Sequence, residues 1–179
     1  MKRDVRPPTL PADEVLDASQ ASQLRFPLDR CGNAPDGLPS LLPEDTPADF
    51  IVTFERGPCF GTCPVYILTV FADGTVAFKG VGFVLAEGTQ TATLSPQQVT
   101  ELYHAVLEAD FFDLEDRYEV AATDLPSILT TVTMDGQIKS VYHYGLGCGT
   151  ELDLAPPGLC ALEALLESIP AANAWVSNS

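Results

Sequence analysis

The chain has 179 residues, of which 46% are hydrophobic, and this is enough apolar material for the core of one globular domain. Its 25 acidic residues outnumber its 9 basic ones, and the formal net charge of −16 repels phosphate backbones, so we expect no nucleic acid partner. No stretch approaches the roughly 20 apolar residues that a membrane-spanning helix needs, so we expect no transmembrane segment.

The first 49 residues contain 8 of the 15 prolines and show no sustained strand or helix period. This predicts a proline-rich arm or tail over residues 1–49, followed by a single α+β domain over residues 50–176. No apolar core follows Met1-Lys2-Arg3, and the five cysteines, an odd number, do not decide the compartment. We expect a cytoplasmic protein if the chain is complete as written, and a cell-envelope or secreted protein if an export signal was trimmed.

The domain opens with two runs of β-branched and aromatic residues, 50–54 and 65–71, which predict two strands paired as a hairpin. Asp73-Gly74 predicts a tight turn, because both residues tolerate positive φ, and residues 75–78 return from it as a third strand. Residues 89–94 form a fourth strand-like run.

A helix is predicted to begin after Ser95. Its hydroxyl can accept a hydrogen bond from the Gln98 amide while the glutamine side chain reaches back, and Pro96 suits the first helical position. The apolar residues that follow recur at helical spacing until the pattern fades near residues 109–110. These residues are Val99, Leu102, Tyr103, Val106 and Leu107.

Residues 128–134 and 138–144 flank Asp135-Gly136 and predict a second hairpin of the same kind. A last helical stripe, ended by Pro170, follows two prolines and comprises Leu159, Leu162, Leu166 and Ile169. The resulting order is ββββαββα with tight turns between strands. This order predicts an α+β fold, an antiparallel sheet of about six strands with two helices packed on one face.

The segment between the first two strands carries two cysteines, Cys59 and Cys63, around a glycine that lets the chain fold back. Paired thiols at this spacing can form a disulfide, stay free in a redox or buried role, or supply half of a metal site. The only zinc assembly that we can propose adds His143 and Cys148, and it has no Cys-x-x-Cys knuckle. Cys63-Pro64 also resembles a short haem-binding motif. We predict no cofactor, with zinc or haem as the alternative.

The box Cys59-Phe-Gly-Thr-Cys63-Pro64-Val-Tyr66, followed by Tyr118 and Thr123-Asp124-Leu-Pro126, resembles a bacterial family of domains of unknown function. The match runs from about residue 51 to 175. The resemblance implies a small α+β domain, often found in exported proteins, and implies no activity. Cys148 and Cys160 lie outside the family pattern, and we expect them to form a second disulfide.

Two hypotheses follow for function. The first is a non-enzymatic binding or interaction module for a protein or small ligand, with the end of the sheet that carries the Cys59–Cys63 loop as its contact surface. Tyr66, Tyr118, Thr123 and Asp124 are the candidate binding residues there. The alternative is a thiol redox or metal site centred on the two cysteines. A cysteine hydrolase using His143, Cys148 and Asp153 is a further alternative, but these residues are close only in sequence.

Overall fold

The computed structural model describes residues 46–150 and 153–177. Most of the arm predicted over residues 1–49, including Cys31, lies outside this range. The described part begins with packed residues, since Thr46 is buried. The Asp49 carboxylate accepts hydrogen bonds from the N–H groups of Asp135 at 3.0 Å and Gly136 at 2.7 Å. These contacts fix residues 46–49 to the second hairpin turn.

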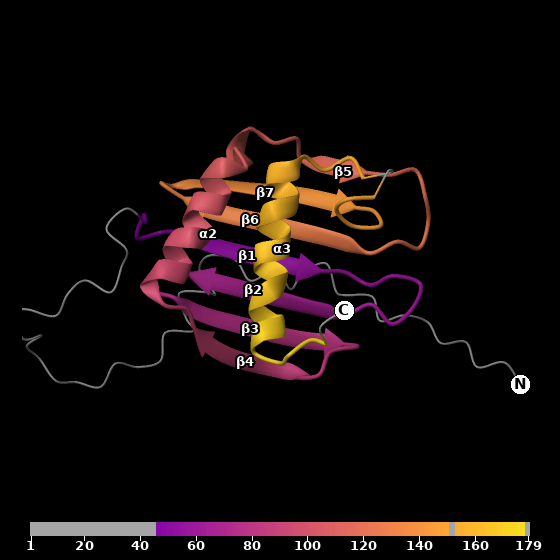
Figure 1. Cartoon of the computed structure of the whole chain (residues 1–179), viewed down its shortest axis with the longest axis horizontal. Helices are drawn as coiled ribbons and strands as arrows, with labels where there is room; N and C mark the ends of the chain where they lie inside the picture. Colours follow the sequence, from indigo (N-terminus) through magenta and orange to yellow (C-terminus); the bar gives the residue numbers. More distant parts are fainter. Residues whose placement is uncertain (1–45, 151–152, 178–179) are drawn as a thin grey trace, which may run out of the picture. The chain divides into compact units, whose positions relative to one another are not determined.

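One seven-stranded sheet forms the first layer of the domain, in the order β4-β3-β2-β1-β6-β7-β5 (Figure 1). All neighbouring pairs are antiparallel except β5 and β7. The strands are β1 (Ile51–Arg56), β2 (Val65–Phe71), β3 (Thr75–Gly82), β4 (Gly88–Thr93), β5 (Arg117–Glu119), β6 (Ser127–Met134) and β7 (Gln137–Tyr144). The predicted α+β fold is therefore confirmed. The strand beyond the six expected is β5, whose three residues are too few to show an alternating pattern.

Both predicted Asp-Gly turns connect antiparallel strands. Gly74 has φ 83°, and Asp135 and Gly136 have φ 50° and 72°, the positive values that hairpin turns require. At Gly74 a Cβ atom would lie 2.5 Å from the Leu94 carbonyl oxygen. That position therefore excludes any side chain by contact as well as by backbone angle.

Two helices, α2 (Pro96–Glu108) and α3 (Pro157–Ala172), cover one face of the sheet and cross its strands (Figure 1). A short 3-10 helix, η2 (Phe111–Asp113), follows α2. The predicted capping box of α2 is present: the Gln98 N–H donates to the Ser95 hydroxyl at 3.3 Å, and the Ser95 N–H donates to the Gln98 side chain at 2.9 Å. The expected end of the last helix at Pro170 is wrong, because α3 continues for two residues. A proline in the last turn removes only one helical hydrogen bond.

The core lies between the sheet and the helices. In α3 the predicted stripe is confirmed, since Leu159, Leu162 and Leu166 have no exposed surface. In α2 the stripe is narrower than predicted, because Leu107 is 42% exposed. Facing them from the sheet are Val52, Phe54, Leu68, Val70, Val76, Phe78, Val132 and Val141. No helix within residues 46–150 and 153–177 is both long and apolar enough to cross a membrane.

Candidate functional site

The antiparallel pairing brings several loops to one end of the sheet. Strands β1, β3, β5 and β7 end there, and β2, β4 and β6 begin there (Figure 1, right). We call the segments that join them, residues 57–64, 83–87, 120–126 and 145–150, the loop end.

A disulfide joins Cys59 to Cys63 in the first of these loops, with Cα atoms 5.8 Å apart. The disulfide interpretation of this pair is therefore confirmed. Between the cysteines, Phe60 holds its side chain in solvent, with 87% of its surface exposed. The Phe60 N–H donates to the Asp124 carbonyl at 3.0 Å, so the backbone of the loop is also attached to the neighbouring connection.

Exposed apolar side chains concentrate on the loop end. Seven large apolar residues of the described ranges are exposed, and four of them belong to the loop end. Those four are Phe60, Phe83, Leu85 and Leu146. Ile138, by contrast, lies at the start of β7 and therefore at the opposite end of the sheet. Exposed apolar residues scattered singly are ordinary, so the weight of this group rests on its concentration at one end of the sheet.

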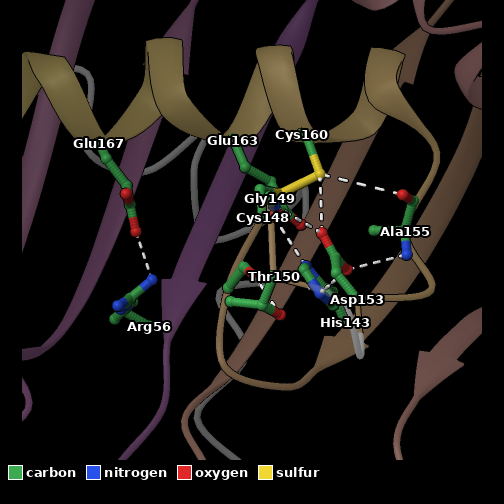
Figure 2. Close-up of a disulfide and its surroundings, with 11 residues drawn as sticks. Arg56, His143, Cys148, Gly149, Thr150, Asp153, Ala155, Cys160, Glu163 and Glu167 are labelled. Atoms are coloured by element: carbon green, nitrogen blue, oxygen red, sulfur yellow. Dashed lines mark hydrogen bonds and ion pairs between the residues drawn. A yellow bond between two sulfur atoms is a disulfide. The ribbon is translucent and has the colours of Figure 1, made fainter.

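A groove of about 260 Å³ runs beside the Cys59–Cys63 loop, between the sheet and α3. Arg56, at the end of β1, forms an ion pair in it with Glu167 of α3 (Figure 2). Tyr66 lines the groove but is only 3% exposed, and its ring packs on Phe54 and Phe78. Burial raises the pKa of Tyr66, so its phenol stays neutral. The remaining walls are Pro64, Ser168, Ala171, Val176 and Ser177.

The other predicted binding residues are dispersed. Thr123 and Asp124 are exposed on the loop end, and Asp124 has φ 68°. Tyr118 lies in β5, and its hydroxyl accepts a hydrogen bond from the Glu115 N–H at 3.1 Å. The structure thus places Asp124 against the cysteine loop through the backbone, keeps Tyr66 in the core and places Tyr118 in a short edge strand.

A second disulfide, between Cys148 and Cys160, links the loop end to the first turn of α3 and covers a buried charged group (Figure 2). The imidazole of His143, which is 3% exposed, lies between two carboxylates. Its Nδ1 is 2.8 Å from Oε2 of Glu163, and its Nε2 is 3.2 Å from Oδ1 of Asp153. We call His143, Asp153 and Glu163 the buried cluster.

The electrostatics of the buried cluster favour a charged imidazole. The hydrogen bond to Glu163 raises the pKa of His143, and the charge of Asp153 acts in the same direction. Burial raises the pKa of Glu163, although the hydrogen bond from His143 opposes this effect. Oε1 of Glu163 is buried with no hydrogen-bond partner. The single positive charge of His143 thus lies between two carboxylates, and Oε1 of Glu163 has no hydrogen-bond donor. Burying a carboxylate oxygen without a donor is costly in a protein interior.

Local structure holds each member of the buried cluster in place. The carboxylate of Asp153 accepts hydrogen bonds from the N–H groups of Gly149 at 3.2 Å and Ala155 at 3.0 Å. Glu163 lies on the buried face of α3. Sequence analysis grouped His143 with Asp153 but missed Glu163. The available signal was its spacing, four residues after Leu159, which places a carboxylate within the apolar stripe.

Two groups of side chains within the described residues can offer a metal ion three ligand atoms that lie within 4.8 Å of one another. One group is His143, Cys148 and Glu163, and the other is Cys148, Asp153 and Cys160. Of the predicted zinc candidates, the structure therefore brings His143 and Cys148 together. Cys59 and Cys63 are bonded to each other and belong to neither group.

Comparison with protein families finds a match over most of the domain: the model of a family described as a domain of unknown function, DUF6438, matches residues 50–170. No curated protein matches the chain. The matched residues extend from just before β1 into the last turn of α3, so they include both disulfides and the buried cluster.

Proposed function

The chain belongs to the DUF6438 family, a domain of unknown function, and we propose that it is a non-enzymatic protein-binding module whose contact surface is the loop end. The observation that carries this proposal is the display of four exposed apolar side chains on that end, with Phe60 at 87% exposure. Large aromatic side chains contribute most of the binding energy in many protein interfaces.

Phe60 is supported as an anchor by the way its loop is built. The two cysteines that flank Phe60 are joined by the disulfide, and the Phe60 N–H donates to the Asp124 carbonyl. Both bonds restrict the backbone of the loop before a partner binds. A restricted loop loses less conformational entropy on binding, so more of the contact energy appears as affinity. The loop thus has the properties of a preorganised contact.

The adjacent groove favours a protein partner over a small-molecule ligand. Its volume of about 260 Å³ is below the range of about 300–1,000 Å³ in which pockets enclose drug-sized ligands. A groove of this size fits a side chain or two of a bound segment. Because Arg56 and Glu167 are already paired in it, the groove offers no unpaired charge from these two residues.

The charge of the chain indicates what the partner surface carries. A formal net charge of −16 attracts basic surfaces and repels acidic ones. We therefore propose a partner segment with an apolar anchor flanked by lysine or arginine. Such steering acts mainly on the association rate and weakens with added salt.

The alternative of thiol redox or metal chemistry at Cys59 and Cys63 has less support. Their loop leads into a strand, whereas thiols are activated at helix N-termini or beside cationic groups. In the described ranges, neither group of potential metal ligands includes them. Intact mass before and after reduction and alkylation, together with metal analysis, distinguishes this alternative from the binding module.

The proposal is tested with a displayed library of random peptides selected on the immobilised full chain. We expect enriched peptides with apolar and basic residues, measured afterwards as synthetic peptides by calorimetry. Phe60→Ser should weaken their binding by about tenfold or more, as truncation of an anchor residue does.

Ile138→Ser is the matched control, because Ile138 is 66% exposed at the opposite end of the sheet. It should leave peptide affinity unchanged. Enriched peptides that bind the Phe60→Ser chain as tightly as the original chain contradict the loop end as the contact surface. Failure to enrich any peptide contradicts the binding-module proposal itself.

A further inference from the structure

We propose that the Cys148–Cys160 disulfide closes a second site, and that its reduction creates a zinc site built from Cys148, Cys160, Asp153 and His143. This site combines Cys148 of the loop end with residues beneath it and uses none of the exposed apolar residues of the proposed contact surface. It is therefore independent of the protein-binding proposal, and each can fail without the other.

The ligand types are those that zinc prefers. Two thiolates, one imidazole and one carboxylate make a four-coordinate set of sulfur, nitrogen and oxygen donors. Three of them already converge, since the ligand atoms of Cys148, Asp153 and Cys160 lie within 4.8 Å of one another. The fourth is adjacent, because Nε2 of His143 is 3.2 Å from Asp153.

For both cysteines to bind the same zinc ion, their sulfur atoms must move apart. In the disulfide the two Sγ atoms are covalently bonded. Two thiolates on a tetrahedral zinc, each about 2.3 Å from the ion, lie about 3.7 Å apart. That separation is also the van der Waals contact of two unbonded sulfurs, so reduction itself moves the thiols toward the spacing that zinc requires.

Glu163 is placed to orient the imidazole ring of His143. A zinc-bound histidine usually donates its other ring N–H to a carboxylate, which fixes the ring and its tautomer. Here Nδ1 of His143 is 2.8 Å from Glu163, and this leaves Nε2 on the side of Asp153. A metal at Nε2 would replace the contact of that nitrogen with Asp153, while the Nδ1–H group of His143 would keep its hydrogen bond to Glu163.

Access to the site is available from two sides. Cys148 is an exposed residue of the loop over residues 145–150, so an external thiol can approach the disulfide from solvent. A cleft of about 10 Å³, about the size of one water molecule, opens beside His143 between Arg56, Ile128 and Gly147. Both openings lie at the loop end.

The redox step balances as a thiol–disulfide exchange with an external dithiol. One thiolate of the dithiol attacks Sγ of Cys148, the Cys148–Cys160 bond breaks, and Cys160 leaves as a thiolate. The second thiol then attacks the mixed disulfide, so the dithiol becomes a disulfide and both cysteines become thiols. Zinc binding releases the two thiol protons and the Nε2 proton of the charged His143.

The test uses the full chain with Cys31, Cys59 and Cys63 replaced by serine, so that only the proposed pair of cysteines is present. The protein is reduced with a water-soluble phosphine, which becomes the phosphine oxide, and zinc affinity is measured by competition with a chromophoric chelator. We expect one zinc per reduced chain and none per oxidised chain. Cobalt in place of zinc should give thiolate charge-transfer bands and the absorption of a tetrahedral site.

Substitutions distinguish ligands from neighbours. Asp153→Asn and His143→Gln should each weaken zinc binding at least tenfold, and Glu163→Gln should weaken it about 10–100-fold by releasing the ring. Glu167→Gln is the matched control, because Glu167 lies one turn further along α3 and pairs with Arg56. It should leave zinc affinity unchanged.

Three results overturn the site. The first is a reduced, folded chain that binds no zinc. The second is equal zinc binding by the complementary Cys148→Ser/Cys160→Ser chain, which retains the other three cysteines. If reduction unfolds the chain, zinc should refold it and raise its melting temperature with concentration, since metal binding supplies folding free energy. Failure of zinc to restore near-ultraviolet circular dichroism is the third.

Discussion

The two disulfides of this domain differ in what they hold. The Cys59–Cys63 bridge closes a loop with a sequence separation of 4 between two strands that already pair, and it presents an exposed phenylalanine. The Cys148–Cys160 bridge spans a separation of 12, joins a loop to a helix, and covers an imidazole between two carboxylates. The first shapes a surface, and the second encloses a buried charge.

This difference shows that bond chemistry alone does not determine what a disulfide contributes. The stabilisation from chain entropy increases with the length of the loop that is closed, and reactivity depends on the groups around the sulfurs. The stabilisation from chain entropy is larger for the Cys148–Cys160 bridge, which closes the longer loop. The following experiments test that ranking, beginning with the core on which both bridges rest.

The largest loss of stability should come from Leu162→Ala in α3. Leu162 has no exposed surface, and truncating such a residue removes apolar burial and leaves a cavity, at a cost of about 2–5 kcal/mol. Leu165→Ala on the same helix is the control, because Leu165 is only partly buried and should cost less. Urea unfolding measures both. Equal losses would mean that α3 does not pack on the sheet as described.

Removing the longer bridge by Cys148→Ser/Cys160→Ser should cost about 3 kcal/mol, the chain-entropy value for a loop of this length. The loss can be compared in urea unfolding of the oxidised variant and the oxidised original chain. An unchanged unfolding midpoint would show that the buried cluster and α3 fix this loop without the covalent bond. The contrast between the two disulfides would then be lost.

The sequence predicted the frame of the domain well because its signals are local. The capping box at Ser95, the Asp-Gly turns and the stripe containing Leu162 each depend on residues within one or two turns of chain. Hairpin turns also fix strand neighbours within β1–β4 and within β6–β7, whereas the pairing of β1 with β6 joins distant segments of the chain. Strand β5 was missed because its pairing with β7 is nonlocal and only three residues long.

The candidate site was predicted less completely for the same reason. Cys59 and Cys63 are close in sequence, so their bridge could be anticipated, whereas Glu163 reaches His143 across 20 residues. The pairing of Arg56 with Glu167 spans 111 residues and depends on how α3 crosses the sheet. The end at which exposed apolar residues gather also becomes visible only when strand directions are known.

The buried cluster should make stability depend on pH. Because the folded protein raises the pKa of His143 above 6.5, its stabilisation is complete below pH 6.5 and is lost as pH rises through the folded pKa. The raised pKa of Glu163 acts in the same direction from about pH 4.5 upward. The charged groups around this pair are Asp153, Arg56 and Glu167.

We therefore expect the free energy of unfolding of the oxidised chain, with a chelator present, to fall as pH rises above about 6.5. The loss should be smaller than that from cutting the longer bridge, since only the protonation-dependent part of the cluster changes. His143→Gln together with Glu163→Gln should remove this slope, and His104→Gln, on the exposed side of α2, should keep it. A slope that persists in the double variant would assign the pH dependence to other groups.

The smallest effect on stability should come from removing the shorter bridge by Cys59→Ser/Cys63→Ser. Extrapolated to so short a loop, the chain-entropy relation gives about 2 kcal/mol as an upper limit. This value is small because the bond restricts the unfolded chain over only a few residues, and in the folded state the pairing of Arg56 with Tyr66 keeps the ends of the loop together without it. Amide exchange should instead become faster over residues 56–64 alone, and Phe60 should lose its fixed position beside Asp124. If amide exchange also becomes faster in β1 and β2, the bridge stabilises the sheet as well as the loop. A melting temperature far below that of the original chain would reverse the ranking of the two disulfides. Faster exchange in the loop alone, with an unchanged melting temperature, would show that this bond mainly holds the Phe60 side chain in place.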